Sequence, residues 1–343
     1  MSDSNKYMGV DCDCITLTRL VLQDHKASDD AAGDLPQVLT ALLTSIKAIS
    51  ANVRKAGFAQ LYGGKHGTIN IHGDVVQQMD MFSNELLINM LRSSFKTCAI
   101  ISEESNTVVE GNLGGRFIVA FDPLDGSCNI DCHVTIGTIF SIWERVSPEG
   151  SKVTEADVLQ TGRKLVAAGY ACYGSATIVM LTTGKGVNGF TLDPAIGSFI
   201  LSHPNIKIPK RGDIYSTNEG HKRFFTEGVK QYLNHINYPK EGEHAMTLRY
   251  VGSCVSDMHR TLLKGGIYFY PPLTNAPGGK LRLLYECMPL AWIMEQAGGI
   301  ASTGTQPILD VQPTSVHQRS PIFIGSPDNV NEVLEFVRKY DHK

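Results

Sequence analysis

The segment 121–131, FDPLDGSCNID, combines two carboxylates with a tight bend. Asp122 ends an apolar run that is typical of a buried strand, Pro123 is expected to stop that strand, and Asp125 follows. Gly-Ser at Gly126 predicts a bend with free backbone N–H groups. Carboxylates beside such N–H groups suit a hard cation that holds a phosphate. An Asx turn with solvated carboxylates is the alternative that this segment alone leaves open.

Other carboxylates also fall at the predicted ends of helices and strands. In α/β folds, strand ends are where ligand sites collect. Several carboxylates share one site only when a cation is present or when they bind protons, because like charges disfavour ionisation. Oxygen-rich ligation without sulfur favours Mg²⁺ or Mn²⁺ over zinc or copper. The residues that could form this site are Asp74, Asp80, Glu103, Glu104, Asp122, Asp125 and Glu286.

Strands and helices are mixed along the chain without a fixed-period repeat. A helix is expected from Asp34, as N-cap with Gln37 as its capping-box partner, to near Gly57. The Gly-rich segment 62–74 lacks periodicity and predicts a mobile loop. Further helices are expected at 75–95, 288–296 and 330–340, the last capped by Asp328. Strands are expected at 98–101, 117–121, 135–143, 165–173, 177–181, 213–216, 249–251 and 267–270.

Composition narrows the class of protein. The 343 residues favour two domains, and a hydrophobic content of 42% with 19% charged residues is that of a globular protein. The net charge of −3 offers no electrostatic case for nucleic acid or a membrane surface. The eight cysteines form no C-x-x-C pair, so free thiols in a reducing compartment are expected.

The ends of the chain carry no address that we recognise. No secretory signal or membrane span is evident, so we expect a cytoplasmic protein. Lys343 does not complete a peroxisomal S-K-L-type signal. A peroxisome-like organelle stays open if the natural chain carries an address beyond that residue.

A series of motifs carries a resemblance to a known family. They occur in the order RKAG, SEE, FDPLDGSCNID, GTIF, LVAAGYACYGSAT, LDPAIG, NEG, RYVGS, HRTL, GKLRLLYEC and LDVQPTSVHQRSP. From about Leu17 to the C-terminus the chain resembles the fructose-1,6-bisphosphatases of animals and plants. This family belongs to the superfamily of Mg-dependent, lithium-sensitive sugar and inositol phosphatases.

The resemblance implies an α/β fold of the sugar phosphatase type, a layered α-β-α-β-α sandwich in two domains. Residues 1–202 would hold an AMP-type regulatory region, a mobile loop at 57–78 and the metal-binding carboxylates. Residues 203–343 would hold the groups that bind the sugar 6-phosphate.

The resemblance also implies a catalytic site that hydrolyses fructose 1,6-bisphosphate with two to three Mg²⁺ ions, for which Mn²⁺ can substitute. Asp74 would join the metals when its loop closes. Asp80 and Glu104 would orient and deprotonate the attacking water, and Arg282 would sit near the metal and the 1-phosphate. The implied metal ligands are Glu103, Asp122, the Leu124 carbonyl, Asp125 and Glu286, and the implied 1-phosphate cradle is formed by Gly126, Ser127 and Cys128.

A second group would bind the 6-phosphate. In a homotetramer, Arg249 would reach into the site of a neighbouring subunit. The family usually has a tyrosine where this chain has His221, which either donates the same hydrogen bond or faces water. The implied residues of this group are Asn218, His221, Arg249, Tyr250, Tyr270 and Lys280.

The implied AMP site lies at the start of the Asp34 helix, where free N–H groups suit a phosphate. Gly33 and Asp34 match the family there, and Arg116 replaces a lysine with its charge kept. The departures from the family pattern are Pro36 for a threonine, Phe117 for a tyrosine and Glu144 for an arginine, with Arg145 beside it. AMP is expected to inhibit, with weakened affinity unless Arg145 compensates.

Alternative functions follow from the same residues. A seven-carbon sugar bisphosphate is hard to separate from the six-carbon one. An inositol or nucleotide phosphatase of the superfamily would not need a pocket for a second phosphate, which Arg249, Tyr250, Tyr270 and Lys280 would form here. A regulatory protein on a retired phosphatase scaffold would be expected to have lost carboxylates, and none is missing.

Overall fold

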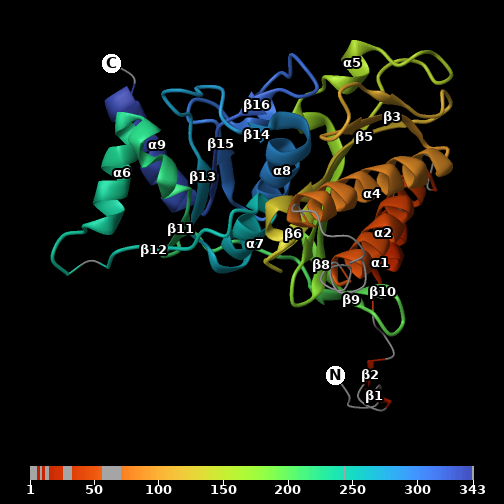
Figure 1. Ribbon diagram of the computed structural model, residues 1–343, viewed down its shortest axis with the longest axis horizontal. Helices are drawn as coiled ribbons and strands as arrows, with labels where there is room; N and C mark the ends of the chain where they lie inside the picture. Colours follow the sequence, from red (N-terminus) through yellow and green to blue (C-terminus); the bar gives the residue numbers. More distant parts are fainter. Residues whose placement is uncertain are drawn as a thin grey trace.

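Helices and sheets form five alternating layers along the long axis of the protein (Figure 1). The computed structural model describes residues 6–7, 10–11, 15–25, 33–55, 71–242 and 244–341, with backbone alone at 6–7, 10–11, 23–25 and 71–77. The predicted α-β-α-β-α sandwich is confirmed. In order, the helices of the three helical layers are α1 (Leu17–His25), α2 (Asp34–Val53) and α4 (Ile71–Ser93), then α7 (Cys254–Lys264) and α8 (Met288–Gln296), then α6 (Glu227–Asn237) and α9 (Pro327–Asp341).

The larger sheet has eight strands and carries most of the site. Its order is β10-β9-β8-β7-β6-β5-β3-β4. The pair β3 and β5 is parallel, and the other neighbours are antiparallel. The strands are β3 (Thr97–Ser102), β4 (Val109–Glu110), β5 (Phe117–Asp125), β6 (Ile136–Glu144), β7 (Leu165–Tyr173), β8 (Thr177–Thr182), β9 (Asn188–Asp193) and β10 (Ser198–His203).

The smaller sheet has five strands in the order β12-β11-β13-β17-β15. The described residues also form two short two-stranded sheets and the one-turn helix α5 (Glu155–Val158). The strands are β11 (Ile214–Ser216), β12 (Thr247–Leu248), β13 (Ile267–Tyr270), β15 (Ile300–Ser302) and β17 (Ile322–Gly325), with β1 (Lys6–Tyr7) beside β2 (Val10–Asp11) and β14 (Leu281–Arg282) beside β16 (Arg319–Ser320).

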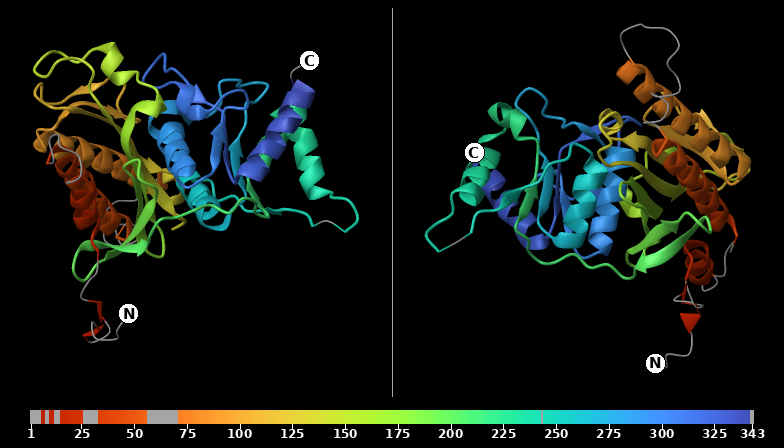
Figure 2. Two further views of the ribbon diagram at one scale, coloured as in Figure 1. Left: turned by 180° about the vertical axis from the view of Figure 1, so that it is seen from behind. Right: turned by 60° about the horizontal axis from the view of Figure 1, so that its bottom comes forward.

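Each layer boundary is a hydrophobic core. Figure 2 shows α1, α2 and α4 together on one side of the larger sheet. The apolar stripe predicted for α2 faces that sheet, with Val38, Leu42, Ile46 and Ile49 fully buried at helical spacing. The core between the sheets holds α7 and α8 and draws on both halves of the chain. The expected domain boundary at 202/203 falls at the last residue of β10 and stays a prediction.

Several predicted boundaries are wrong. Helix α2 begins at Asp34 with Gly33 as its N-cap, and Asp34 forms an ion pair with Lys96 at 2.7 Å instead of capping. Asp328 lies in the first turn of α9, which begins at Pro327. No strand forms at 249–251, where one was expected. The strand in this region, β12, covers Thr247–Leu248 instead.

The loop predicted before α4 is shorter than expected. The helix begins at Ile71, so 71–78 of the expected mobile loop 57–78 are helical. The rest of that loop from 57 to 70 lies outside the described residues.

Disulfide bonds and membrane-spanning helices can be assessed only for the described residues. The six described cysteines are free, as expected, while Cys12 and Cys14 lie outside that part. Among the helices that the structure describes, none is long and apolar enough to span a bilayer.

Candidate active site

The ends of β3 and β5 bring the first carboxylates together. These strands are parallel, and Ser102 pairs with Phe121 near the ends of both. Glu103, which follows β3, donates its N–H to the Phe121 carbonyl at 3.2 Å. Its side chain therefore starts beside Asp122 on β5, as the strand-end argument requires.

The strand β5 does not stop at Pro123 as predicted. It continues to Asp125, and its pairing with β6 shifts register between Asp122 and Asp125. This bulge accommodates a residue that has no N–H for the ladder. Asp122 accepts the Leu124 N–H at 3.0 Å, and both residues are buried. The bulge therefore turns two carboxylates at the end of one strand toward the same region.

Helix α7 holds Asp125. Ser253, the N-cap of α7, donates its hydroxyl to Asp125 Oδ2 at 2.6 Å. The N–H of Val255 donates to the same oxygen at 2.9 Å, and that of Cys254 donates to Oδ1 at 3.3 Å. The helix N-terminus thus stabilises the carboxylate. Sequence reasoning missed this role of Ser253, although serine before a helical apolar pattern is an N-cap signal.

Glu286 reaches the same region from a π-helical turn, Leu283–Cys287, which follows β14. It accepts the backbone N–H of Arg282 at 2.5 Å. One side-chain ligand atom from each of Asp125, Cys254 and Glu286 lies within 4.8 Å of the other two. Cys254 was not expected here. Burial raises the pKa of its thiol well above the usual range, with Asp125 and Glu286 adding to the effect.

These carboxylates are buried together with little compensating charge. Burial, followed by the charge of Glu103, raises the pKa of both Asp122 and Glu286 well above their usual values. Burial also raises the pKa of Asp125, against hydrogen bonds that lower it. Arg282 Nε lies 3.9 Å from Glu103 Oε1. Within the described part of the chain, this is the only ion pair made by the four carboxylates Glu103, Asp122, Asp125 and Glu286. Such a set of oxygen donors fits a hard cation.

Helix α4 adds Asp80 beside this cluster. Burial raises the pKa of Asp80 to about 7, helped by the charge of Glu104, while a hydrogen bond with the Ser127 side chain lowers it. Glu104 is exposed, and its N–H donates to Ser102 Oγ at 3.2 Å. Asp80 and Glu104 thus lie near each other at the open side of the buried group. The side chain of Asp74, also on α4, lies outside the described residues.

The bend after β5 requires a glycine. Gly126 has φ +75°, and a Cβ there would lie 2.6 Å from the Ser253 Cβ. Ser127 to Asn129 form a single 3₁₀ turn. The N–H groups of Ser127 and Cys128 begin that turn and have no acceptor within it. The tight bend predicted from the Gly-Ser pair is therefore present, and its first N–H groups follow Asp125 directly along the chain.

A second group of predicted residues meets around Tyr270, at the end of β13. The Tyr270 hydroxyl lies 3.4 Å from His221 Nδ1, and Lys280 Nζ lies 5.4 Å from the ring centroid. Asn218 caps the 3₁₀ turn that carries His221, and its carbonyl accepts the His221 N–H at 3.1 Å. Burial and then the nearby Tyr270 raise the pKa of Tyr250. The structure thus brings five of the six predicted residues together.

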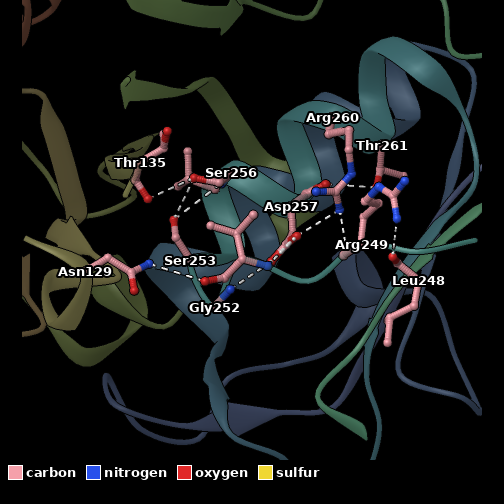
Figure 3. A network of polar contacts seen from close by, with 12 residues as sticks. Asn129, Thr135, Leu248, Arg249, Gly252, Ser253, Ser256, Asp257, Arg260 and Thr261 are labelled. Atoms are coloured by element: carbon pink, nitrogen blue, oxygen red, sulfur yellow. Dashed lines mark hydrogen bonds and ion pairs between the residues drawn. The ribbon is translucent and has the colours of Figure 1, made fainter. Parts of the chain in front are cut away.

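Arg249, the sixth, is exposed beside Tyr250. Figure 3 shows the segment that follows it, between Arg249 and Ser253. This segment contacts the 3₁₀ turn Ser127–Asn129, where Asn129 Nδ2 donates to the Val251 carbonyl at 3.4 Å. It joins the Tyr270 group to the buried carboxylates, because Ser253 holds Asp125.

The expected AMP region lies apart from these groups, at the start of α2. Arg116 is adjacent to this start, since its N–H donates to the carbonyl of Lys96, the partner of Asp34. Its guanidinium forms an ion pair with Glu144 at 3.3 Å.

The other residues expected to shape the AMP region are buried or hydrogen-bonded to other parts of the protein. Arg145 is buried and donates to the Leu113 carbonyl at 2.8 Å and to Ser147 Oγ at 2.7 Å. Phe117 and Pro36 are buried. Arg145 is therefore not placed to compensate for Glu144.

Comparison with known proteins identifies the family. A family model described as the fructose-1-6-bisphosphatase N-terminal domain matches residues 15–204, and one described as the C-terminal domain matches residues 208–338. The chain belongs to the fructose-1,6-bisphosphatase family. The resemblance drawn from the motifs is thereby confirmed.

Members of this family from animals and plants align over nearly the whole chain. Fructose-1,6-bisphosphatase isozyme 2 of Oryctolagus cuniculus is 50% identical over 341 residues, which cover 99% of this chain and 98% of the relative. Fructose-1,6-bisphosphatase 1 of Bos taurus is 49% identical, over 97% of this chain and 98% of its own. The cytosolic fructose-1,6-bisphosphatase of Oryza sativa subsp. indica is 47% identical, over 94% of each.

Proposed function

We propose that this protein hydrolyses the 1-phosphate of D-fructose 1,6-bisphosphate, giving fructose 6-phosphate and phosphate, a step of gluconeogenesis. The observation that carries the proposal is that the fold holds a buried carboxylate cluster and a separate group of polar and basic side chains around Tyr270. Family membership supports the same activity.

The carboxylate cluster suits divalent cations. Its donors are oxygens, their pKa values are raised, and a positive charge among them would favour their ionised forms. Mg²⁺ or Mn²⁺ ions, two to three per site, would supply an acidified water and neutralise charge on the phosphate. We propose as ligands Glu103, Asp122, the Leu124 carbonyl, Asp125 and Glu286, with Asp74 joining them.

The chain's own groups then handle the proton and the phosphoryl oxygens. Asp80, with a pKa of about 7, is poised to accept a proton from the attacking water near neutral pH, and Glu104 assists it. The N–H groups of Gly126, Ser127 and Cys128 would hold the oxygens of the 1-phosphate.

The Tyr270 group would bind the other phosphate. Lys280 supplies positive charge beside the Tyr270 ring, and the hydroxyls of Tyr270 and of the nearby Tyr250 can donate hydrogen bonds. Asn218 and His221 border the same place. A monophosphate would leave this group unused, which argues against inositol and nucleotide monophosphates. A seven-carbon bisphosphate would use it equally and is the second candidate substrate.

The test is phosphate release from the bisphosphate compared with fructose 1-phosphate and inositol 1-phosphate, with Mg²⁺ and with excess chelator. We expect the highest kcat/KM for the bisphosphate and no turnover in chelator. Equal kcat/KM for the monophosphates would contradict the role of the Tyr270 group. Full activity in chelator would contradict the metal site.

Arg249 is proposed to act across a subunit boundary in a homotetramer. Its side chain is exposed, which leaves it available to a neighbour. Mixing Arg249→Ala subunits with Asp122→Ala subunits should regenerate some sites that have both residues. Verified hybrids without recovered activity would place Arg249 within its own subunit's site.

AMP is proposed as an inhibitor that binds at the start of α2 with reduced affinity. Gly33, Asp34 and Phe117 lie in that region, and Arg116 would pair with the nucleotide phosphate. Glu144 already compensates part of the Arg116 charge, so this ion pair must break before Arg116 can pair with the phosphate.

We also propose a cytosolic location, supported by the rice relative named as cytosolic. Cell fractionation that finds the protein in an organelle would contradict it.

A further inference from the structure

The segment 249–253 connects the two ends of the proposed substrate site. Arg249 and Tyr250, at its start, belong to the proposed 6-phosphate group. Ser253, at its end, caps α7 and donates to Asp125. The strand β12 ends at Leu248, and the Arg249 N–H still donates to the carbonyl of Tyr215 on β11 at 2.9 Å. The residues that follow Arg249 leave the sheet and need other partners for their backbone.

Asp257 provides part of that anchor from the first turn of α7. Its carboxylate is completely buried. Oδ1 and Oδ2 accept the Val251 N–H at 3.1 and 3.0 Å, and Oδ2 accepts the Gly252 N–H at 3.2 Å. One carboxylate thus satisfies two consecutive N–H groups of the segment after it has left the sheet.

Arg260, one turn further along α7, completes the anchor. Its Nη2 donates to Asp257 Oδ1 at 2.8 Å and to the Arg249 carbonyl at 2.8 Å. Figure 3 shows Asp257 between Gly252 and Arg260, with Arg249 beyond them. The Arg249 guanidinium donates to the Leu248 carbonyl at 3.0 Å and is exposed. Arg260 therefore holds the backbone of Arg249 and leaves its side chain outside the helix.

We propose that Asp257 and Arg260 are positioning residues for recognition of the 6-phosphate. They hold the backbone of 249–252 so that Tyr250 presents its side chain to the 6-phosphate in its own subunit and Arg249 presents its side chain to the 6-phosphate in the neighbouring subunit. The proposal rests on the proposed function of Arg249 and Tyr250. It adds that selectivity for a bisphosphate depends on two residues of α7 that do not touch the substrate.

The alternative is that the buried pair only stabilises α7. A stability effect would reduce the fraction of active protein and lower turnover of every substrate alike. A positioning effect changes the ratio of kcat/KM for the bisphosphate to kcat/KM for fructose 1-phosphate, which lacks the far phosphate. That ratio is the readout that separates the two roles.

The test variant is Arg260→Met. Methionine keeps an apolar stem of similar length, and Asp257 Oδ1 keeps the Val251 N–H as a donor. We expect the ratio to fall about tenfold, mainly through a higher KM for the bisphosphate, as loss of uniform binding would produce. Arg260→Lys, which restores a donor and the charge, should recover part of the ratio. If the methionine variant folds poorly, the ratio measured for Arg260→Lys still tests the proposal.

The matched control is Arg211→Met. Arg211 forms an ion pair with Glu332 at 2.8 Å on the outer side of the smaller sheet, so the same substitution there should leave the ratio unchanged. Arg249→Ala provides the reference for loss of the arginine itself. In the double variant Arg249→Ala/Arg260→Met the ratio should fall by less than the product of the two single effects, because Arg260 acts in part through Arg249.

The outcomes distinguish the inference from the proposed function. If Arg249→Ala lowers the ratio and neither Arg260 variant does, the inference is wrong and the 6-phosphate role stands. If Arg260→Met lowers kcat/KM for both substrates equally, Arg260 is only structural and the inference is overturned. If Arg249→Ala leaves the ratio unchanged, the proposed 6-phosphate role fails and the inference falls with it.

Discussion

Replacing Glu286 by glutamine should have opposite effects on stability with and without metal. The variant keeps the shape of the side chain and can still accept the Arg282 N–H. It removes one charge from a group whose oxygens approach one another closely. In the chelated protein this change should stabilise the fold, whereas with Mg²⁺ it should remove a ligand.

The size of the effect follows from the spacing of the carboxylates. Ligand oxygens of Asp125 and Glu286 lie within 4.8 Å of each other. At an effective dielectric constant of about 20, two charges at that distance repel by roughly 3.5 kcal/mol. If both carboxylates are ionised in the chelated wild type at pH 8, the variant gains about 3 kcal/mol there, and a proton retained by either carboxylate reduces this gain. For a chain of this length, the full gain corresponds to a melting temperature higher by about 4 °C.

The gain should depend on pH in a defined direction. Burial and Glu103 raise the pKa of Glu286, so the folded protein binds a proton there more tightly than the unfolded chain. The wild type therefore loses stability as pH rises from the ordinary glutamate pKa, about 4.3, toward the raised value. The variant has no proton to lose at this position. Its advantage should shrink to roughly 1–2 kcal/mol at pH 5.5.

The assay is thermal unfolding of both proteins in chelator at pH 5.5 and 8, repeated at pH 8 with saturating Mg²⁺. Wild type should be the less stable protein in chelator and the more stable one in Mg²⁺. Glu149→Gln, at an exposed carboxylate, should behave like wild type throughout. A less stable variant in chelator at pH 8, or equal stabilisation of both by Mg²⁺, would refute the reasoning.

Three further predictions concern the bend, the far phosphate and the regulatory region. Gly126→Ala should lower kcat at least tenfold and cost more stability than Gly150→Ala, which shares a positive φ but has open space around it; equal stability losses would argue against the close approach. His221→Tyr should change KM for the bisphosphate more than kcat, and an unchanged KM from pH 6 to 8 in both proteins would mean that this side chain only faces water. Arg116→Ala should weaken AMP inhibition and Glu144→Gln should strengthen it by freeing Arg116, whereas AMP titrations that coincide for all three proteins would contradict this site.

The sequence predicted those features that depend on local patterns. Apolar runs identified the interior strands of the larger sheet, as at 165–173, because strands buried on both faces are nearly continuous in hydrophobic residues. The Gly-Ser bend was found from turn chemistry, and the clustering of Glu103 with Asp122 from strand ends that share one sheet edge.

Features that depend on tertiary contacts were missed. Pro123 suggested the end of a strand, but pairing with β6 and a bulge carry β5 to Asp125. Asp34 looked like a cap, and its ion pair with Lys96 comes from a residue distant in sequence. Ser253 carries a local N-cap signal, but its hydrogen bond to Asp125 joins residues that are distant in sequence.

The central claim is that this chain removes the 1-phosphate of fructose 1,6-bisphosphate at the carboxylate cluster. Phosphorus NMR of the reaction in Mg²⁺ tests it directly, because it distinguishes the two possible monophosphate products. We predict fructose 6-phosphate and inorganic phosphate as the products of wild type, formed at least a hundredfold more slowly by Glu286→Gln. Fructose 1-phosphate as the product, or equal rates for the two proteins, would contradict the account.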